Sequence, residues 1–331
     1  MKIVLIAAAV LAGIVAYRIF TPLSKSTPAA KQPVQPNKIP DSTTSDGETR
    51  LHAHVAALIG TSRPRNSANL DALNEAAEYI FKEFTSYGFK AEEQKYRVGG
   101  NEYKNILASY GPQDAAERIV IGAHYDVAGE MPGADDNASG IAGLLEIARM
   151  FSVRKPQVKY RVDFVAFSLE EPPHFGSHSM GSNVHARSLR DAGVKLRGMV
   201  CLEMIGYYSD EPGSQRYPVQ GMEKMYPDKG NYIAVVSNMD NKKLVEEISA
   251  GIKSGSAIPV ETLNAPEAVT GIGLSDHRSY WEYGFPAAMI TNTAFLRNPH
   301  YHEPTDTIET LDFKRMNEVA KGVFNAVVNL K

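Results

Sequence analysis

Residues 118–151 read RIVIGAHYDVAGEMPGADDNASGIAGLLEIARMF, and this segment carries much of the information on fold class. It begins with a short apolar run rich in β-branched residues, which is typical of a buried strand. A polar connection with several glycines follows, and apolar residues then recur at helical spacing from Ala138 to Phe151. The segment therefore predicts a strand, a loop and a helix in succession.

The same alternation continues along the chain. Further apolar runs rich in β-branched residues lie at 160–168, 198–205, 232–237 and 287–291. Further helical patterns lie at 70–87, 180–192, 241–253 and 313–330. Strands that alternate with helices favour an α/β fold, in which a largely parallel sheet is covered by helices on both faces.

The composition of the 331 residues is that of an ordinary globular protein. Hydrophobic residues make up 43% of the chain and charged residues 22%, and 35 Lys and Arg against 38 Asp and Glu leave a net charge of −3. This balance excludes disordered, collagen-like and coiled-coil chains, and without a basic cluster we expect no nucleic-acid partner. The single cysteine, Cys201, excludes an internal disulfide, a Cys₄ zinc site and an iron–sulfur cluster. Its apolar neighbours indicate a buried side chain.

The first 48 residues differ from the rest. Lys2 precedes an apolar run over 3–17 that ends at an arginine, a pattern typical of an export segment. We expect residues 1–20 to form an uncleaved signal anchor, with a cleaved signal peptide as the alternative. Residues 21–48 are rich in Pro, Ser and Thr, which predicts a solvated linker before one folded domain over 49–331. The protein is therefore expected to be exported and membrane-anchored with its folded domain outside the cytoplasm, or secreted if the segment is cleaved.

Polar side chains gather where the predicted strands end. His124 closes the first run, and Asp135 and Asp136 stand just before the helix that follows it. Glu170 and Glu171 follow the next strand. Sites in open α/β sheets form beyond the carboxyl ends of the strands, so these residues are candidates for chemistry. Each also has a structural explanation, because an acid before a helix can cap it and an acid pair can lie in a solvated loop.

Two more strand ends supply candidates. Glu203 interrupts the apolar run at 198–205, where a buried charge needs a partner or a metal unless the side chain faces the surface. The polar loop NPHYHEPTD follows the last run and contains His300 and His302. The Tyr-His-x-x-x-Asp context favours His302 as the ligand.

Together the strand ends supply imidazoles and carboxylates but no thiolate. This donor set suits a catalytic zinc or a related divalent ion with open coordination positions. Five ligands that share one carboxylate suit two ions roughly 3.5–4 Å apart, and a further carboxylate beside them suits a general base. The residues of the set are His124, Asp136, Glu170, Glu171, Glu203 and His302.

The motifs HYD, GADDNASG, SLEEPP, LEMIGY and PHYHEPTDT, in this order, resemble those of a zinc-peptidase family. The family, metallopeptidase family twenty-eight, contains bacterial secreted aminopeptidases, glutamate carboxypeptidase and glutaminyl cyclases. The resemblance covers nearly all of residues 50–331. It implies a three-layer α/β/α fold with a central mixed, mostly parallel sheet, a zinc peptidase catalytic domain over 49–331, and peptides as substrates.

The resemblance also implies how the metal ligands are grouped. It assigns His124, Asp136 and Glu203 to one zinc ion and Asp136, Glu171 and His302 to the other, or the reverse grouping of the two glutamates. Asp136 is shared in either case. Many members carry Asp where this chain has Glu203, and the longer side chain is compatible with two ions or with one.

By the same resemblance, three residues act on the reaction without being ligands. Glu170 is the general base, which takes a proton from the attacking water and returns it to the leaving amine. Asp126 orients His124, and Tyr301 is a candidate hydrogen-bond donor to the developing oxyanion. The combined inferences favour a zinc-dependent exopeptidase, most of all an aminopeptidase. Glutaminyl cyclisation or carboxypeptidase cleavage is the alternative at this site, and an inactive binding module is the alternative from another class.

Two segments receive no role in the chemistry. Ser275, Asp276 and His277 are consecutive and no GxSxG elbow occurs in the chain, so we expect no serine nucleophile. Asp276 and His277 are expected to cap a helix or to line the pocket. The connection over 206–231 is rich in Gly, Pro and Tyr, which predicts a long loop that shapes substrate choice.

Overall fold

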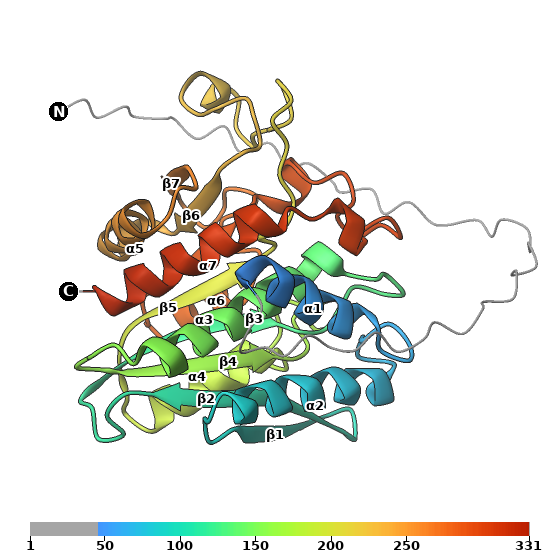
Figure 1. Ribbon diagram of the computed structural model, residues 1–331, viewed down its shortest axis with the longest axis vertical. Coiled ribbons are helices and arrows are strands. Elements are labelled where there is room, and N and C mark those ends of the chain that lie inside the picture. The colour runs from blue at the N-terminus through green and yellow to red at the C-terminus, as the bar shows by residue number, and fades with distance from the viewer. Residues whose placement is uncertain (1–45, 331) are drawn as a thin grey trace, which may run out of the picture. The chain divides into compact units, whose positions relative to one another are not determined.

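A mixed sheet of eight strands runs through the part of the chain that the computed structural model describes, residues 46–330 (Figure 1). In chain order the strands are β1 (Glu92–Val98), β2 (Asn101–Tyr110), β3 (Glu117–His124), β4 (Arg161–Phe167), β5 (Lys195–Glu203), β6 (Ile233–Ser237), β7 (Val260–Asn264) and β8 (Ala287–Thr291). Their order across the sheet is β1-β2-β4-β3-β5-β8-β6-β7. The central strands β4, β3, β5 and β8 are parallel, whereas β1 with β2, β2 with β4, and β6 with β8 are antiparallel.

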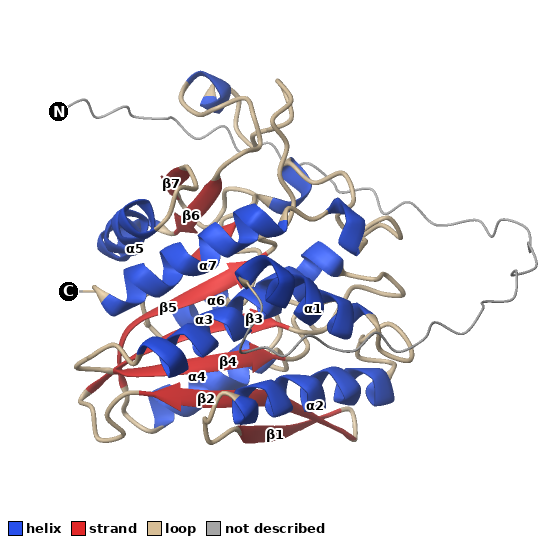
Figure 2. Cartoon of the chain, viewed as in Figure 1, coloured by secondary structure: helices blue, strands red, loops and turns tan. Residues whose placement is uncertain are grey.

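Helices cover both faces of this sheet (Figure 2). One face carries α1 (Gly47–Ile59), α2 (Leu70–Ser86), α3 (Gly140–Arg154), α5 (Lys242–Gly255) and α7 (Phe313–Val328). The other face carries α4 (Gly181–Asp191) and α6 (His277–Glu282), which lie behind the sheet in Figure 1. Each face buries its own apolar core. The predicted three-layer α/β/α fold with a mixed, mostly parallel sheet is confirmed.

The strands that the apolar pattern does not predict include both edges of the sheet. β1 has the polar sequence EEQKYRV, and none of its residues is fully buried. In β7, at the opposite edge, only Val260 is buried. An edge strand packs with fewer neighbours, so it needs no continuous apolar run. β2, which links β1 to the parallel strands, is likewise absent from the prediction.

The folded part begins slightly before the predicted boundary at residue 49. α1 starts at Gly47, and Asp46 caps it by accepting a hydrogen bond of 2.8 Å from the backbone N–H of Thr49. The predicted signal segment over 1–20 and most of the predicted linker over 21–48 lie outside the described residues. Among residues 46–330, no helix has the length and apolar character needed to cross a membrane.

The direction of the strands brings several loops to one edge of the sheet. The carboxyl ends of β3, β4, β5 and β8 meet there because these strands are parallel. β6 and β7 run in the opposite direction, so their amino ends lie at the same edge. The loops that carry the predicted site residues therefore face the first residues of β6 and β7.

Candidate metal centre

Two groups of imidazole and carboxylate side chains converge at this edge. His124, Asp136 and Glu203 form one group and Asp136, Glu171 and His302 form the other, with the ligand atoms of each group within 4.8 Å of one another. Atoms of His124, Glu170 and Glu171 also lie within this distance of one another, which places Glu170 beside the ligands. His124 Nε2 lies 3.4 Å from Asp136 Oδ1, and His302 Nε2 lies 3.1 Å from Asp136 Oδ2. The two oxygens of Asp136 thus face two separate sites. In this geometry Glu203 belongs with His124, and Glu171 belongs with His302.

These side chains fit divalent cations. Burial and the nearby Asp136 charge raise the pKa of Glu171 to about 7. Burial also opposes the ionisation of Asp136, but contacts with both histidines hold its pKa below the usual range. Glu171 Oε1 and His302 Nε2 are buried and make no hydrogen bond. Buried acceptors beside like charges are unfavourable unless a cation lies between them, and zinc suits this mixture of imidazole and carboxylate ligands.

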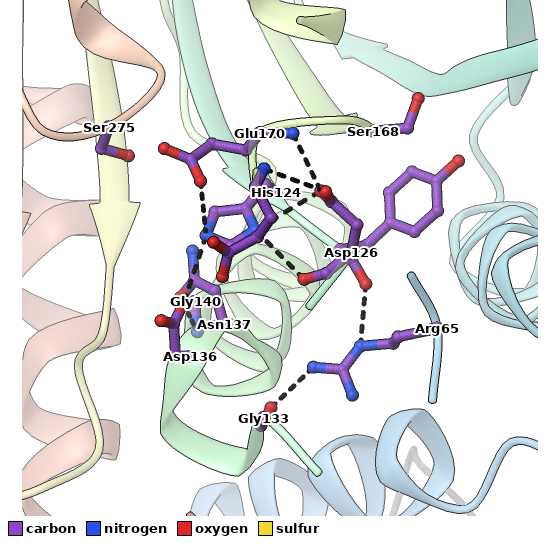
Figure 3. Close-up of polar contacts among 12 residues, drawn as sticks. Arg65, His124, Asp126, Gly133, Asp136, Asn137, Gly140, Ser168, Glu170 and Ser275 are labelled. Carbon is purple, nitrogen blue, oxygen red and sulfur yellow. Dashed lines mark hydrogen bonds and ion pairs between the residues drawn. The ribbon is translucent and has the colours of Figure 1, made fainter. Parts of the chain in front are cut away.

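Glu170 lies beside both groups on the turn after β4. One oxygen of its carboxylate is 3.8 Å from His124 Nε2, and Figure 3 shows this carboxylate close to His124 and Asp136. Burial raises the pKa of the Glu170 carboxyl well above its ordinary value, and the charge of His124 offsets only part of that rise. A carboxylate in this position can accept a proton from a molecule bound at the ligand groups and can donate it back.

Asp126 links the strand end of β3 to that of β4. Its two carboxylate oxygens accept hydrogen bonds of 3.1 Å from the backbone N–H groups of Glu170 and Glu171. Its carbonyl oxygen lies 3.2 Å from His124 Nδ1, and its Oδ1 lies 3.5 Å from the same atom. Asp126 thus lies where it can orient His124, as predicted, and it also positions the glutamate pair.

Asp306 repeats this arrangement on the other side of the centre. Its Oδ1 accepts a hydrogen bond of 2.9 Å from the backbone N–H of Asp135, and its Oδ2 accepts one of 3.0 Å from that of Asp136. Sequence reasoning does not predict this contact, because Asp306 follows Asp136 by most of the length of the domain. Its place in the loop that also carries His302 is the only sequence signal that it lies near the centre.

Arg65 is a second residue that the sequence does not single out. Its guanidinium donates hydrogen bonds to the carbonyl oxygens of Tyr125, Pro132 and Gly133, which belong to the loop between His124 and Asp136. The side chain is 1% exposed, and Figure 3 shows it reaching Gly133. An arginine in the polar stretch SRPRN carries no signal of burial. The structure shows that it holds the ligand-bearing loop in place.

Asp135 and Asp136 have different surroundings although they are adjacent. Asp135 Oδ2 accepts hydrogen bonds of 2.7 Å from the side-chain amides of Asn292 and Asn298, so it faces away from the ligand groups. The first backbone N–H of α3 is bonded by Asn137 Oδ1. The explanation that Asp135 or Asp136 caps the helix is therefore wrong.

Left-handed backbone conformations occur at or beside three of the candidate site residues. Leu169, with φ 61°, directly precedes Glu170, and Met204, with φ 50°, directly follows Glu203. His302 itself has φ 56°. Such conformations cost roughly 1–3 kcal/mol for residues other than glycine, so the surrounding packing must hold them. These turns change the chain direction within one residue and keep the reactive side chains at the edge of the sheet.

The residues around Glu203 correct two expectations. Glu203 is 6% exposed and accepts a hydrogen bond of 2.6 Å from Ser275, so the surface-facing explanation is wrong. Asp276 is fully buried at the start of α6, and neither of its oxygens makes a hydrogen bond, so it does not cap that helix. Burial raises the pKa of Asp276 to about 7, although the nearby Ser182 hydroxyl offsets part of the rise.

Tyr301 lies next to His302, one of the candidate ligands. Its ring stacks on the imidazole of His302 with the ring centroids 3.9 Å apart, and it lines the cavity described next. Burial raises the pKa of the Tyr301 hydroxyl far above its ordinary value, so the hydroxyl stays protonated. His300 lies outside both groups and contacts Thr305 Oγ1 at 2.8 Å. The preference for His302 therefore agrees with the geometry, and the oxyanion role of Tyr301 stays a prediction.

A cavity of about 260 Å³ opens beside the centre. Its polar end is lined by Asp136, Glu170, Glu171, Glu203 and His302. The remaining walls are mainly apolar and aromatic and come from β6, β7, β8 and neighbouring loops, including the connection over 206–231. A concave apolar space with convergent polar groups at one end is typical of a small-ligand site.

The peptidase family M28 matches residues 105–327. This chain belongs to peptidase family M28. The metallopeptidases of this family typically bind two zinc ions, and the two ligand groups fit that number. YfbL of Escherichia coli, an uncharacterized protein, is 44% identical over 303 residues, which are 89% of this chain and 92% of YfbL. Leucine aminopeptidase 1 of Arthroderma otae is 30% identical over 240 residues, which are 68% of this chain and 57% of that protein.

Solved structures share the fold. The aminopeptidase from Aneurinibacillus sp. strain AM-1 matches with a TM-score of 0.64 and 19% identity, over 86% of this chain and 94% of that chain. Glutaminyl cyclases also have this fold. The predicted family and fold are thus confirmed. The fold alone does not separate cleavage of an N-terminal residue from cyclisation, which depends on the pocket and the reacting groups.

Proposed function

We propose that this M28 member is a zinc-dependent aminopeptidase that releases N-terminal residues from peptides. The observation that carries the proposal is the sharing of Asp136 between two ligand groups, with Glu170 beside both. The match to leucine aminopeptidase 1 favours an aminopeptidase over other reactions of the family. The apolar cavity next to the groups suits the side chain of a terminal residue.

His124, Asp136 and Glu203 would hold one zinc ion, and Asp136, Glu171 and His302 would hold the other. Zinc in these positions supplies Lewis acidity that polarises the scissile carbonyl and lowers the pKa of a water. Asp126 and Asp306 keep the ligand-bearing backbone in register through their paired hydrogen bonds.

Glu170 accepts the proton of the attacking water and passes it to the leaving amine. Its burial favours the protonated carboxyl, so the proton is held between the two steps. The protonated hydroxyl of Tyr301 is the donor for the oxygen that gains negative charge. The apolar walls of the cavity bind the terminal side chain and keep water away from it.

The test compares E170Q with the wild type as zinc-loaded full-length proteins. We expect kcat on aminoacyl p-nitroanilides to fall by about 10²–10⁴, because general-base catalysis is lost while the ligands remain. Metal content by atomic absorption should stay unchanged. E303Q, which alters an exposed carboxylate next to His302, is the matched control. Substantial hydrolysis by E170Q contradicts the base assignment, and a cyclised product from N-terminal Gln with no released amino acid contradicts the aminopeptidase.

We further propose that the protein acts outside the cytoplasm, bound to the membrane or secreted. This proposal rests on the apolar run and its flanking charges within residues 1–20. Fractionation of cells that express the full chain, with the mass of the exported form, tests the location and the cleavage together. Recovery only in the cytoplasm contradicts it.

A further inference from the structure

We propose that Glu261 makes the cavity selective for an N-terminal residue with a positive charge on a long apolar stem, that is, lysine or arginine. The inference rests on the proposed aminopeptidase function and names its substrate class. Glu261 lies in β7, lines the cavity and is half-buried. It belongs to neither ligand group.

The sheet places Glu261 on the same row as a metal ligand. Glu203 pairs with Thr291, Thr291 with Ala234, and Ala234 with Glu261, across β5, β8, β6 and β7. Paired residues of adjacent strands point to the same face of a sheet. Adjacent strands lie about 4.8 Å apart, so three steps put Glu261 roughly 14 Å from Glu203. The cavity thus has a carboxylate at each end of one row.

The space between these carboxylates is mainly apolar and aromatic. The strand residues that line it are Ala234, Val236, Leu263 and Met289, together with the hydroxyl-bearing Thr262 and Thr291. Tyr217 and Tyr226 also line it, and their hydroxyls donate to the carbonyl oxygens of Pro227 and Thr262. Their aromatic rings therefore suit the methylene stem of a long side chain, and the faces of such rings also attract cations.

Glu261 has no cationic partner among the described residues. No Lys or Arg lines the cavity, and the Glu261 carboxylate makes no hydrogen bond or ion pair with residues 46–330. Burial first, and the charge of Glu261 second, raise the pKa of Tyr226, which puts the carboxylate near that ring. A half-buried carboxylate next to apolar walls is stabilised when a ligand brings a cation to it.

The other carboxylates of the cavity do not compete for that cation in the zinc-loaded protein. Asp136, Glu171 and Glu203 would hold the two zinc ions, whose positive charge offsets that of their carboxylates. An extended lysine or arginine side chain reaches roughly 6–7 Å from its Cα, whereas leucine reaches roughly 4 Å and carries no charge. With the terminal residue held at the ligand groups, only the longer side chains bring a charge close to Glu261.

The test compares lysine with norleucine, which has a similar apolar stem without the ammonium group. The protein is the zinc-loaded full-length chain, as wild type, E261Q and E246Q. Glu246 is an exposed carboxylate on α5 that pairs with Lys242, far from the cavity wall, and so is the matched control. Two readouts are used: kcat/KM on the two p-nitroanilides, and calorimetric affinity for lysinamide and norleucinamide.

We expect wild type and E246Q to favour lysine over norleucine by about 10- to 100-fold in both readouts, as for a hydrogen bond between charged groups. E261Q should move this ratio towards one. Equal treatment of lysine and norleucine by the wild type, or an unchanged ratio in E261Q, overturns the proposal. If no reporter is cleaved, the aminopeptidase is contradicted, while the ratio of affinities still decides the role of Glu261.

Discussion

Two buried carboxylates lie close together in the sequence and have opposite surroundings. Glu146, in the middle of α3, is 2% exposed and accepts hydrogen bonds of 2.7–2.8 Å from both Arg50 and Arg149. Asp136, just before α3, is 5% exposed and lies among other acids, with its two oxygens 3.4 Å from His124 Nε2 and 3.1 Å from His302 Nε2. Both are buried charges, but only Glu146 lies between permanently charged groups of the protein, whereas Asp136 lies among other carboxylates, including Glu171, whose Oε1 makes no hydrogen bond.

The difference shows how burial of a charge should be interpreted. A carboxylate held between two guanidinium groups needs nothing more, and it joins α1 to α3. A carboxylate among like charges is stable only with a cation that the chain does not supply. A buried carboxylate between cationic side chains therefore indicates a structural role, and a cluster of buried carboxylates and imidazoles indicates a metal site. The three predictions below test this distinction, in addition to the E170Q and E261Q experiments.

The largest effect is expected at Asp136. D136N should lose both zinc ions and with them turnover, because the residue belongs to both groups. E203A and E171A should each lose one ion, because in the proposed assignment each glutamate holds one ion. Metal content after equilibrium dialysis, measured by atomic absorption, checks this. E146Q is the control and should keep both ions. Retention of two ions by D136N contradicts the shared-ligand assignment.

A smaller effect, on stability alone, is expected at Glu146. Removal of one partner from a buried ion pair costs about 3–5 kcal/mol, because the two arginines lose the negative charge and one of the two oxygens that they contact. E146Q should lower the free energy of unfolding by about this amount in urea. The matched control is E78Q, an exposed carboxylate that pairs with Lys82 on α2 and should change stability by at most about 0.5 kcal/mol. If E146Q lost metal, Glu146 would also be needed for metal binding, and the contrast between a structural Glu146 and a metal-binding Asp136 would be contradicted.

The smallest effect, and one that depends on pH, is expected at Asp276. Its pKa is about 7 in the folded state against an ordinary value of 3.8, so the folded protein binds a proton that the unfolded chain releases between these pH values. Stability is therefore highest below about pH 4 and falls as pH rises to about 7. The Asn side chain of D276N does not ionise, so this loss of stability with rising pH should be absent from the variant.

Thermal unfolding of the metal-free protein checks the sign. D276N should be more stable than the wild type by about 1–3 kcal/mol at pH 8, where the wild type holds a buried, unbonded carboxylate. At pH 4 the two proteins should differ little, because protonated Asp and Asn are both neutral. The same difference at both pH values would show that Asp276 does not titrate with the fold.

The chemistry of the site could be predicted because it depends on residue types at strand ends. Apolar runs mark β3, β4, β5 and β8, and the acids and histidines that follow them are visible in the sequence. Parallel strands bring those ends together in any order across the sheet. The ligand set therefore does not require knowledge of the exact topology.

The supporting residues could not be predicted in this way. Arg65 and Asp306 act through backbone atoms of distant segments, and nothing in their neighbours signals such contacts. Glu261 lies on an edge strand that has no apolar run. The helix-capping explanation fails because Asn137, and neither aspartate, accepts the first backbone N–H of α3. The contacts of Asp135 with Asn292 and Asn298 come from a distant segment and are not visible in its neighbours.

The sequence by itself determined the α/β class, the family and the donor atoms of the metal centre, because periodicity and strand-end residues are local properties. Only the tertiary structure decided that Glu203 lies with His124 and Glu171 with His302. It also decided that Asp135 lies outside both groups. It did so through the strand order, in which β8 separates β5 from β6 and β7 closes the edge. That order turns Glu203 and Glu261 into the two ends of one cavity, because contacts between distant strands follow from packing and not from local sequence.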